Sequence, residues 1–341
     1  MTKSRNKHKI TVLGAGIWGT VMANLLACHG RKVCLWEFFK DVAGKIKSEG
    51  THPDLPDLNL TSRLSVTTDI KAALENSCMC IIAVPSKHVR KIARKIKKYA
   101  DPSVLFVSLS KGIETSSLKT ACEVMEEEIP GLRDRIMILS GPSFAAEVCK
   151  GVPTQMILAG KNMNGLLEAR RILNLHPLRI EISPDRKGVE LGGALKNVYA
   201  IGSGIIEGLK NTGKNTEAAF LTQSMLEMHK IITRLGGKPE TTRGLSVTGD
   251  MILTGTSRKS RNFQFGEKIG RGMKPETART EIKTAVEGFE SVLSMKKLCR
   301  EIKIKAPIIE TLWEILYTNS GPLRILEAMG FNANGAKKSR K

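Results

Sequence analysis

The sequence predicts an N-terminal α/β domain with a doubly wound, largely parallel sheet, followed by an all-α domain. In the first half of the chain, apolar β-branched runs that suit buried parallel strands alternate with amphipathic helical patterns. From about Asp185, strand signals vanish and helical periodicity dominates as far as Met329. This change of pattern predicts domains over residues 1–184 and 185–330, with a basic tail over residues 331–341.

The first predicted strand, residues 10–13, runs into a glycine-rich turn. The turn reads Gly14-Ala15-Gly16-Ile17-Trp18-Gly19, a G-x-G-x-x-G pattern, and a helical pattern follows at once. Strand, glycine turn and helix in this order favour the binding of a dinucleotide. Gly14 would allow the tight turn, Gly16 the approach of a pyrophosphate, and Gly19 the close packing of helix on strand. The alternative is a glycine-rich turn in an α/β domain of another kind.

A second apolar strand, residues 32–36, ends at Glu37. In a dinucleotide-binding domain of the Rossmann type, an acid about 20 residues past the glycines bonds the ribose diol of the adenosine. Its charge would repel a 2′-phosphate, so Glu37 favours NAD over NADP, with NADP still possible. The alternative is a solvated acid at the end of a strand.

The remaining elements complete the Rossmann-like sheet. Further strands are predicted over residues 64–67, 78–84, 103–109, 136–139, 154–159 and 176–182, and helices over residues 41–49, 69–75, 88–99, 115–128 and 162–174. Lys111 follows the strand at 103–109, and ligands of open α/β sheets lie beyond the carboxyl ends of the strands. Lys111 is therefore a candidate ligand contact, the alternative being a surface lysine in a loop. The turn at residues 140–144 follows the next strand and leads into a helix that contains Ala145.

The helical half contains one isolated lysine in an apolar, glycine-rich helix at residues 188–206. Between Val189 and Ile206 the only charged residues are Glu190 and Lys196. The neighbours of Lys196 three and four residues away are small or apolar, which would leave room for a ligand beside the amine. Burial would lower the pKa of this lysine and so suit it to general acid–base catalysis. The alternative is an ordinary solvated lysine.

Two further polar groups interrupt the helical pattern. Asp250 stands before an apolar helical turn and is either an N-cap or a carboxylate of a site. Ser260-Arg261-Asn262 offers a hydroxyl, a guanidinium fork suited to phosphate, and an amide. Because Arg258 and Lys259 stand beside this triplet, a surface cluster is the alternative. Val286-Glu287-Gly288 breaks a later helical pattern, and a final helix is predicted at residues 308–317.

Composition limits the classes of function. The net charge is +21 over 341 residues. Part of this charge lies in the two ends of the chain, at Lys3, Arg5, Lys7, Lys9, Lys337, Lys338, Arg340 and Lys341. A nucleic-acid binder would account for the charge, but aromatic residues are few and no nucleic-acid module is recognisable, so no nucleic-acid partner is expected. Anionic substrates and a generally lysine-rich proteome are the simpler explanations.

No apolar run approaches the roughly 20 residues that span a membrane, and no signal peptide is recognisable. The seven cysteines form no C-x-x-C pair and the six histidines have no zinc-site spacing. We therefore expect a cytoplasmic protein with reduced thiols, no metal site and no transmembrane segment.

The motifs above, taken in order, closely resemble those of NAD(P)-dependent glycerol-3-phosphate dehydrogenases. The resemblance covers roughly residues 10–330, and the combination of L-G-G-A-x-K-N with S-R-N makes it specific. The matching segments are Gly14-Ala15-Gly16-Ile17-Trp18-Gly19-Thr20, Ser110-Lys111-Gly112-Ile113-Glu114, Ser140-Gly141-Pro142-Ser143-Phe144-Ala145, Leu191-Gly192-Gly193-Ala194-Leu195-Lys196-Asn197-Val198, Gly249-Asp250, Ser260-Arg261-Asn262, Val286-Glu287-Gly288 and Ala306-Pro307-Ile308.

The resemblance implies a cytoplasmic homodimer that interconverts dihydroxyacetone phosphate and sn-glycerol 3-phosphate for phospholipid synthesis. It implies that Lys196 is the proton acceptor. The implied substrate contacts are Lys111, Gly141, Ser143, Lys196, Asp250, Ser260, Arg261 and Asn262. The implied cofactor contacts, besides Gly14, Gly16, Gly19 and Glu37 inferred above, are Ile17, Trp18, Phe38, Lys111, Ala145, Arg261 and Glu287.

Two segments depart from the family pattern. Val247-Thr248 precede Gly249-Asp250 where the family usually has Gly-Leu, and Thr222-Gln223 stand where it often has Thr-Arg. These differences bear on the packing around Asp250 and on regulation, and leave the reaction class unchanged. The alternatives are another two-domain NAD-dependent hydroxyacid dehydrogenase, which would not need the Ser260-Arg261-Asn262 triplet, and a binding protein without catalysis.

Overall fold

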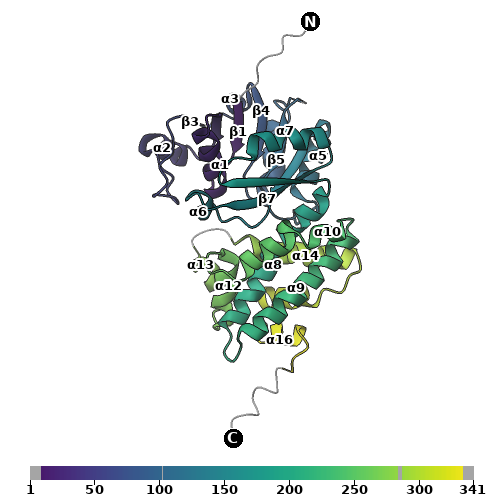
Figure 1. The fold of residues 1–341 in the computed structure, drawn as a ribbon. Helices are drawn as coiled ribbons and strands as arrows, with labels where there is room; N and C mark the ends of the chain where they lie inside the picture. The colour runs from purple at the N-terminus through teal and green to yellow at the C-terminus, as the bar shows by residue number, and fades with distance from the viewer. Residues whose placement is uncertain (1–8, 102, 283–285, 333–341) are drawn as a thin grey trace. The chain divides into compact units, whose positions relative to one another are not determined.

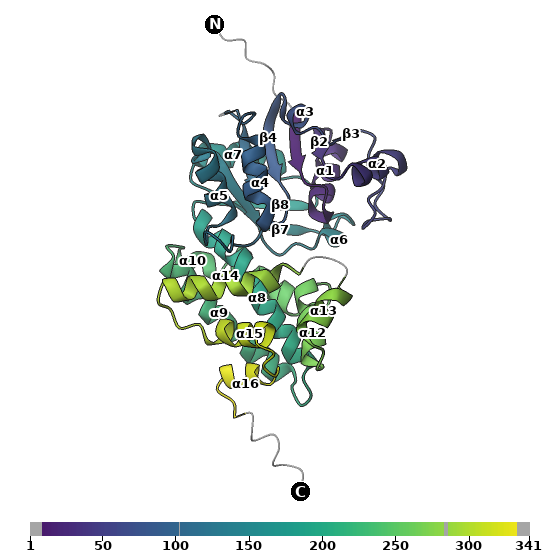
Figure 2. The same cartoon turned by 180° about the vertical axis from the view of Figure 1, so that it is seen from behind.

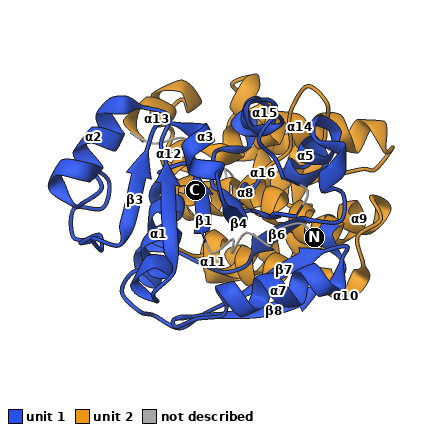
Figure 3. Cartoon of the chain, turned by 90° about the horizontal axis from the view of Figure 1, so that it is seen from above, with its two compact units in different colours: residues 1–111, 120–186 blue, residues 112–119, 187–341 orange. Residues whose placement is uncertain are grey.

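The structure, a computed structural model, describes residues 9–101, 103–282 and 286–332 (Figure 1). Contacts between residues divide the chain into two compact units, coloured in Figure 3. Unit 1 comprises residues 1–111 and 120–186, and unit 2 comprises residues 112–119 and 187–341. The basic ends of the chain, apart from Lys9, lie outside the described residues. The predicted domains, a dinucleotide-binding one over residues 1–184 and a helical substrate and catalytic one over residues 185–330, stay a prediction.

Unit 1 is built on a sheet whose described strands have the order β3-β2-β1-β4-β5-β6-β7-β8. All neighbouring strands are parallel except β6 and β7, which are antiparallel. The strands are β1 Lys9–Leu13, β2 Lys32–Trp36, β3 Leu64–Thr67, β4 Ser77–Ile82, β5 Leu105–Ser108, β6 Ile136–Ser140, β7 Thr154–Gly160 and β8 Leu178–Ser183. The predicted doubly wound sheet is confirmed.

Helices cover both faces of this sheet, since α7 and α4 stand in front of it in the opposite views of Figures 1 and 2. The helices of unit 1 are α1 Ile17–Cys28, α2 Lys40–Glu49, α3 Ile70–Leu74, α4 Val89–Ile96, α5 Ala121–Glu128, α6 Ala145–Val148 and α7 Met163–Leu173, with single 3-10 turns η1 Ser86–His88 and η2 Pro130–Leu132. The strands inside the sheet, such as β4, β5 and β6, are buried on both faces because helices cover both, which explains their continuous apolar runs.

Local capping explains where the helices begin. The Asp69 side chain accepts hydrogen bonds from the amides of Lys71 and Ala72, as an N-cap does. The predicted helix at 115–128 is wrong in its first part, because α5 begins only at Ala121. Leu118 has a positive φ of 54°, which ends any helix, and Thr120 forms a capping box with Glu123.

Unit 2 is helical, as predicted. Its elements are α8 Arg186–Gly208, which starts at the last residue of unit 1, α9 Lys214–Arg234, α10 Pro239–Thr242, the π-helical turn η3 Leu245–Gly249, α11 Asp250–Gly255, α12 Arg261–Gly270, α13 Pro275–Glu281, α14 Glu287–Glu301, α15 Pro307–Tyr317 and α16 Arg324–Ala328. The prediction that the helix at 308–317 is the last is wrong, because α16 follows it.

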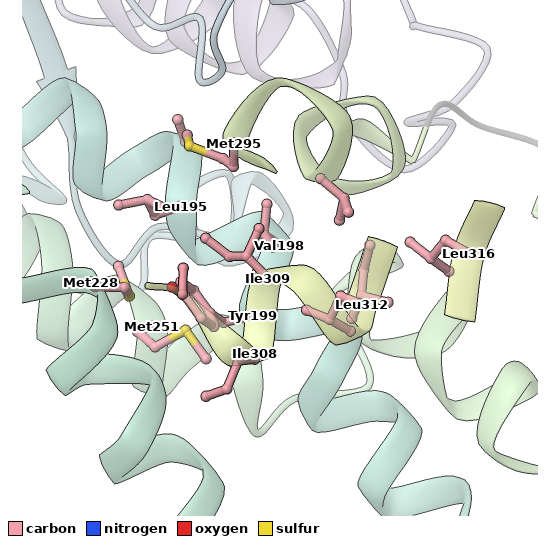
Figure 4. Packing of buried hydrophobic residues seen from close by; sticks show 14 of the residues in the cluster. Leu195, Val198, Tyr199, Met228, Met251, Met295, Ile308, Ile309, Leu312 and Leu316 are labelled. Carbon is pink, nitrogen blue, oxygen red and sulfur yellow. The ribbon is translucent and has the colours of Figure 1, made fainter. Parts of the chain in front are cut away.

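The core of unit 2 gathers around α8. Figure 4 shows Leu195, Val198 and Tyr199 of α8 among apolar side chains of α9, α11, α14 and α15. Helices α8 and α12 touch backbone to backbone, since a Cβ at Gly204 would lie 2.0 Å from the carbonyl oxygen of Phe263. This close contact fixes the start of α12, where Ser260, Arg261 and Asn262 lie, against the helix that carries Lys196.

Candidate active site

The glycine turn of unit 1 has the shape that a pyrophosphate requires. Gly14 has a φ of +107°, which favours glycine. A Cβ at Gly19 would lie 2.0 Å from the carbonyl oxygen of Gly14, so α1 packs closely on the turn. Gly16 is the exposed N-cap of α1, without a side-chain cap, and a Cβ there would meet nothing within 4 Å. The amides of the first turn of α1, with Ile17 and Trp18, therefore suit an anionic group.

The carboxylate of Glu37 is bound to the backbone of this turn. Glu37 is only 7% exposed, so its interpretation as a solvated strand end is wrong. One oxygen accepts a hydrogen bond of 3.0 Å from the amide of Ala15, and the other accepts one of 2.9 Å from the amide of Phe39. Each oxygen has a second lone pair, so a contact with a ribose diol stays a prediction.

The predicted cofactor contact Phe38 lies beside positive charge. Its side chain is 48% exposed and touches the rings of Trp36 and Phe39 edge to face. The ammonium groups of Lys91 and Lys95, on α4, lie 5.3 and 4.6 Å from the centre of the Phe38 ring. One buried carboxylate and two cations thus flank the segment that follows β2.

A second hydrogen-bond system joins the glycine turn to the loop after β6. The indole of Trp18 donates to the carbonyl oxygen of Ser143 at 3.1 Å. The Ser143 hydroxyl donates to the carbonyl oxygen of Gly141 at 2.9 Å, and the ammonium of Lys111 reaches the same oxygen at 3.4 Å. Ala145 follows this loop as the buried first residue of α6. The structure therefore brings these predicted cofactor and substrate contacts of unit 1 together.

The central polar cluster of unit 2 is Lys196, Asp250 and Thr254. The Lys196 ammonium donates to an Asp250 carboxylate oxygen at 2.6 Å and to the Thr254 hydroxyl at 2.9 Å. The Thr254 hydroxyl lies 3.3 Å from the same carboxylate oxygen. Lys196 is 9% exposed and Asp250 is fully buried, so neither is an ordinary surface residue. The N-cap interpretation of Asp250 is also wrong, because Gly249 is the N-cap of α11.

Gly192, one of the small residues beside Lys196, serves a different purpose from the one predicted. A Cβ at Gly192 would lie 2.5 Å from a Val247 methyl group and 2.9 Å from the Ser246 carbonyl oxygen. Gly192 therefore leaves room for η3, which leads directly into Asp250, and not for a ligand.

The predicted phosphate triplet is only partly exposed. Ser260 and Asn262 are buried and Arg261 is exposed, so the surface-cluster alternative is wrong for two of the three. Ser260 is the N-cap of α12 and accepts a hydrogen bond from the amide of Phe263. Arg258, which had supported the surface alternative, pairs with Glu207 and Glu267.

Asn197 links this triplet to Glu287. Its side-chain oxygen accepts from Asn262 at 3.0 Å, and its amide donates to Glu287 at 3.4 Å. The Asn262 oxygen in turn accepts from the amide of Gly288 at 3.0 Å. Sequence reasoning assigned no role to Asn197 or Thr254. The position of Thr254, four residues after Asp250 on one helix, was the signal that places the two side chains on one face.

Other kinds of site find no support in the described residues. Among residues 9–101, 103–282 and 286–332, no group of three or more His, Cys, Asp or Glu side chains is arranged to hold a metal ion. The seven cysteines are free thiols. Within the same part of the chain, no helix is long and apolar enough to cross a membrane.

Two family models match the chain. The model of the NAD-dependent glycerol-3-phosphate dehydrogenase N-terminus matches residues 9–166, and that of the C-terminus matches residues 185–327. A glycerol-3-phosphate dehydrogenase [NAD(P)+] from Bacillus subtilis (strain 168) is 38% identical over 311 residues, 91% of this chain and 90% of the relative. One from Thermoanaerobacter sp. (strain X514) is 40% identical over 314 residues, 92% of this chain and 94% of the relative.

A solved structure agrees with these relatives. The crystal structure of glycerol-3-phosphate dehydrogenase from Coxiella burnetii matches with a TM-score of 0.89 and 33% identity. The match covers 95% of this chain and 98% of that one.

Proposed function

The chain belongs to the family of NAD-dependent glycerol-3-phosphate dehydrogenases, and from this premise we propose how its own residues perform the reaction. The reaction is reversible hydride transfer between NAD(P)H and C2 of dihydroxyacetone phosphate, which yields sn-glycerol 3-phosphate. The alternative of another two-domain hydroxyacid dehydrogenase is not favoured, because both family models and the relatives named above are glycerol-3-phosphate dehydrogenases.

The residues of unit 1 hold the dinucleotide in this proposal. The turn at Gly14, Gly16 and Gly19 fits a pyrophosphate, because Gly16 has open space above it and the first amides of α1 lack side-chain caps. Ile17 and Trp18 flank the pyrophosphate, and Glu37 and Phe38 meet the adenosine end. The bound nicotinamide ring supplies the hydride, or accepts it in the reverse direction.

Lys196 acts as the general acid in the reductive direction. Its ammonium gives a proton to the oxygen on C2 as that oxygen gains negative charge, and the neutral amine takes the proton back in reverse. The carboxylate of Asp250, 2.6 Å away, stabilises the charged form and opposes the effect of burial. The Thr254 hydroxyl accepts a second hydrogen bond, so the direction in which the third N–H of Lys196 points is fixed.

The substrate phosphate is a dianion and needs charged or hydrogen-bonded partners when it leaves water. Arg261 offers a planar guanidinium fork for two phosphate oxygens. Ser260 still has a hydroxyl hydrogen to donate, because its oxygen serves as the acceptor for the Phe263 amide. Asn262, Lys111, Gly141 and Ser143 complete the proposed substrate contacts, and Ala145, Arg261 and Glu287 the proposed cofactor contacts.

Three finer points belong to the proposal. Glu37 favours NAD over NADP, because a 2′-phosphate near its buried carboxylate would be repelled. A homodimer in the cytoplasm is what the resemblance to the family supports. Supply of glycerol 3-phosphate for phospholipid synthesis follows from the same resemblance.

The observation that carries the proposal is the buried Lys196–Asp250–Thr254 cluster in a chain that belongs to this family. The test follows the absorbance of NADH with dihydroxyacetone phosphate, in parallel with NADPH and with unphosphorylated dihydroxyacetone. We expect rapid oxidation of NADH with the phosphorylated ketone alone. Folded protein that binds NADH but oxidises it with neither ketone would overturn the proposal.

A further inference from the structure

The backbone of Ala15, in the middle of the glycine turn, is bound by two buried side chains. Its amide donates to Glu37, as described above, and its carbonyl oxygen lies 2.6 Å from Nε2 of His52. Ala15, Glu37 and His52 are each less than a tenth exposed. His52 comes from the loop between α2 and β3, so two different segments hold the two polar groups of one residue.

The hydrogen bonds of His52 define its tautomer. The amide of Asp54 donates to Nδ1 at 3.0 Å, so Nδ1 carries no hydrogen. Nε2 therefore carries it and donates to the carbonyl oxygen of Ala15, which can only accept. One rigid ring thus uses its acceptor to hold its own loop and its donor to hold the glycine turn.

The loop that presents His52 is itself well anchored. The carbonyl oxygen of His52 accepts from the amide of Leu55 at 2.8 Å, and the amide of Leu60 donates to the carbonyl oxygen of Gly50 at 2.8 Å. Leu55, Leu58 and Leu60 pack against the apolar core of unit 1. The loop therefore holds His52 in place, and the position of His52 does not depend on its contact with Ala15.

The peptide bond that His52 holds joins Ala15 to Gly16, in the turn where the proposed function places the pyrophosphate. The carbonyl group of Ala15 and the amide of Gly16 belong to one planar trans peptide and point in opposite directions. Fixing the carbonyl oxygen therefore fixes the direction of the Gly16 N–H. Without a Cβ at Gly16, this peptide would otherwise turn at little cost. Glu37 fixes the preceding peptide in the same way.

We propose that His52 is a positioning residue for the cofactor: by holding the carbonyl oxygen of Ala15, it aims the Gly16 amide at the pyrophosphate. The turn then does not have to become ordered when the cofactor binds, and the free energy that this ordering would cost is retained as binding affinity. The inference rests on the proposed function only for the identity of the cofactor. Because NADH and NADPH share the pyrophosphate, His52 should serve both to the same degree.

Two substitutions at His52 separate its two hydrogen bonds. His52→Gln places an amide nitrogen near the position of Nε2 and so keeps a donor for Ala15. His52→Asn reaches only the position of Nδ1, so it keeps the link to Asp54 and loses the one to Ala15. His29→Gln is the matched control, because His29 is an exposed histidine of the same unit that bonds only its own helix.

The experiment measures the dissociation constants of NADH and NADPH by fluorescence titration, with kcat and KM for dihydroxyacetone phosphate at saturating NADH. We expect His52→Asn to raise both dissociation constants about tenfold, as the loss of about 1.4 kcal/mol in one hydrogen bond would. His52→Gln should stay within about threefold of the wild type on the same grounds, and His29→Gln should match it. We expect kcat and the KM for the ketone to stay unchanged in all three.

Three results would overturn the inference. These are unchanged dissociation constants in His52→Asn, equal losses in His52→Asn and His52→Gln, and a loss confined to NADPH, which would place His52 at the adenosine end. A purely structural role would lower the melting temperature and the active fraction without raising the dissociation constant of the folded protein. Wild-type protein that binds NADH without reducing dihydroxyacetone phosphate would contradict the proposed function, while the same titrations would still decide the role of His52.

Discussion

The ammonium of Lys196 and the carboxylate of Asp250 form a buried ion pair with a nitrogen–oxygen distance of 2.6 Å. Their side chains are 11% and 0% exposed. Two charges in such a place stabilise each other, and removal of one takes the partner ion away from the other in a medium of low polarity. The fold must therefore accommodate the pair, apart from the catalytic role proposed for Lys196.

This double role is separable by a mutant cycle. We expect Asp250→Leu and Lys196→Met each to lower the free energy of unfolding by about 3–5 kcal/mol, because each removes the partner ion of a buried charge. The double variant should be more stable than either single one, although it has no activity. Urea unfolding of the four proteins measures this. If the two single losses simply add up in the double variant, the two charges do not interact as the geometry indicates.

The chemical role of Lys196 is tested by Lys196→Ala. Loss of general acid–base help lowers kcat by about 10²–10⁴, whereas the dissociation constant of NADH should stay the same. The matched control is Lys210→Ala, which removes an exposed lysine just after α8 and should leave kcat unchanged. Substantial turnover in folded Lys196→Ala would remove this residue from the catalytic role.

Gly192 offers a test of how Asp250 is positioned. In Gly192→Ala the new Cβ would lie 2.5 Å from Val247 and 2.9 Å from the backbone of Ser246, so η3 must move. Such overpacking costs about 1–3 kcal/mol of stability, and movement of η3 shifts the adjacent Asp250. We expect a lower kcat at unchanged affinity for NADH, measured by steady-state kinetics and titration. Gly213→Ala is the control, because a Cβ there meets nothing within 4 Å.

The sequence predicted most of this fold because its signals are local. The turn at Gly14–Gly19, the N-cap at Asp69 and the change to helical periodicity near Asp185 each depend on residues that lie close together in the chain. The start of the helix at 115–128 was predicted wrongly because Leu118 adopts a positive φ. The sequence gives no sign of this conformation, since Leu118 is not a glycine. The antiparallel β7 was likewise invisible, because pairing direction depends on the whole sheet.

Contacts between distant segments account for what was missed at the candidate site. His52 lies 37 residues from Ala15, so nothing in its loop pointed to the glycine turn. The sequence predicts space for a ligand beside Lys196, but the neighbour of Gly192 is Val247, which no periodicity within α8 reveals. Lys196 and Asp250 are candidates from their own surroundings in the sequence, but only the resemblance to a family places both in one site.

The charges around Phe38 predict how cofactor preference responds to substitution. Lys91 and Lys95 would attract a 2′-phosphate and Glu37 would repel it. The preference for NADH or NADPH therefore depends on the difference between this attraction and this repulsion. We expect the double variant Lys91→Ala/Lys95→Ala to lose affinity for NADPH about tenfold, from two exposed charge contacts, with little change for NADH. Titration of both cofactors at two salt concentrations measures this. The matched control Lys97→Ala/Lys98→Ala removes the same charge just after α4. An equal loss of NADPH affinity in this control would show that net charge, and not the position of Lys91 and Lys95, causes the effect.

Glu227 makes the stability of the helical unit depend on pH. Its carboxylate is 5% exposed and accepts hydrogen bonds from the amides of Ile308 and Ile309, at the start of α15, and from the Tyr199 hydroxyl. Burial raises the pKa of Glu227 above its ordinary value of 4.5, although these hydrogen bonds oppose the shift. The folded chain therefore binds this proton more tightly than the unfolded chain does. The stabilisation is fully present below pH 4.5 and is lost as the pH rises through the raised value.

Replacement of Glu227 by glutamine removes this titration. The free energy of unfolding of the wild type relative to Glu227→Gln should fall as the pH rises above 4.5, by at most about 1.4 kcal/mol per pH unit, and then level off. Urea unfolding at a series of pH values from 4 to 8 measures the difference, with the exposed Glu240→Gln as the control. A difference between wild type and Glu227→Gln that does not vary with pH would show that Glu227 titrates alike in the folded and unfolded chains. The hydrogen bonds to α15 and Tyr199 would then fully offset the effect of burial.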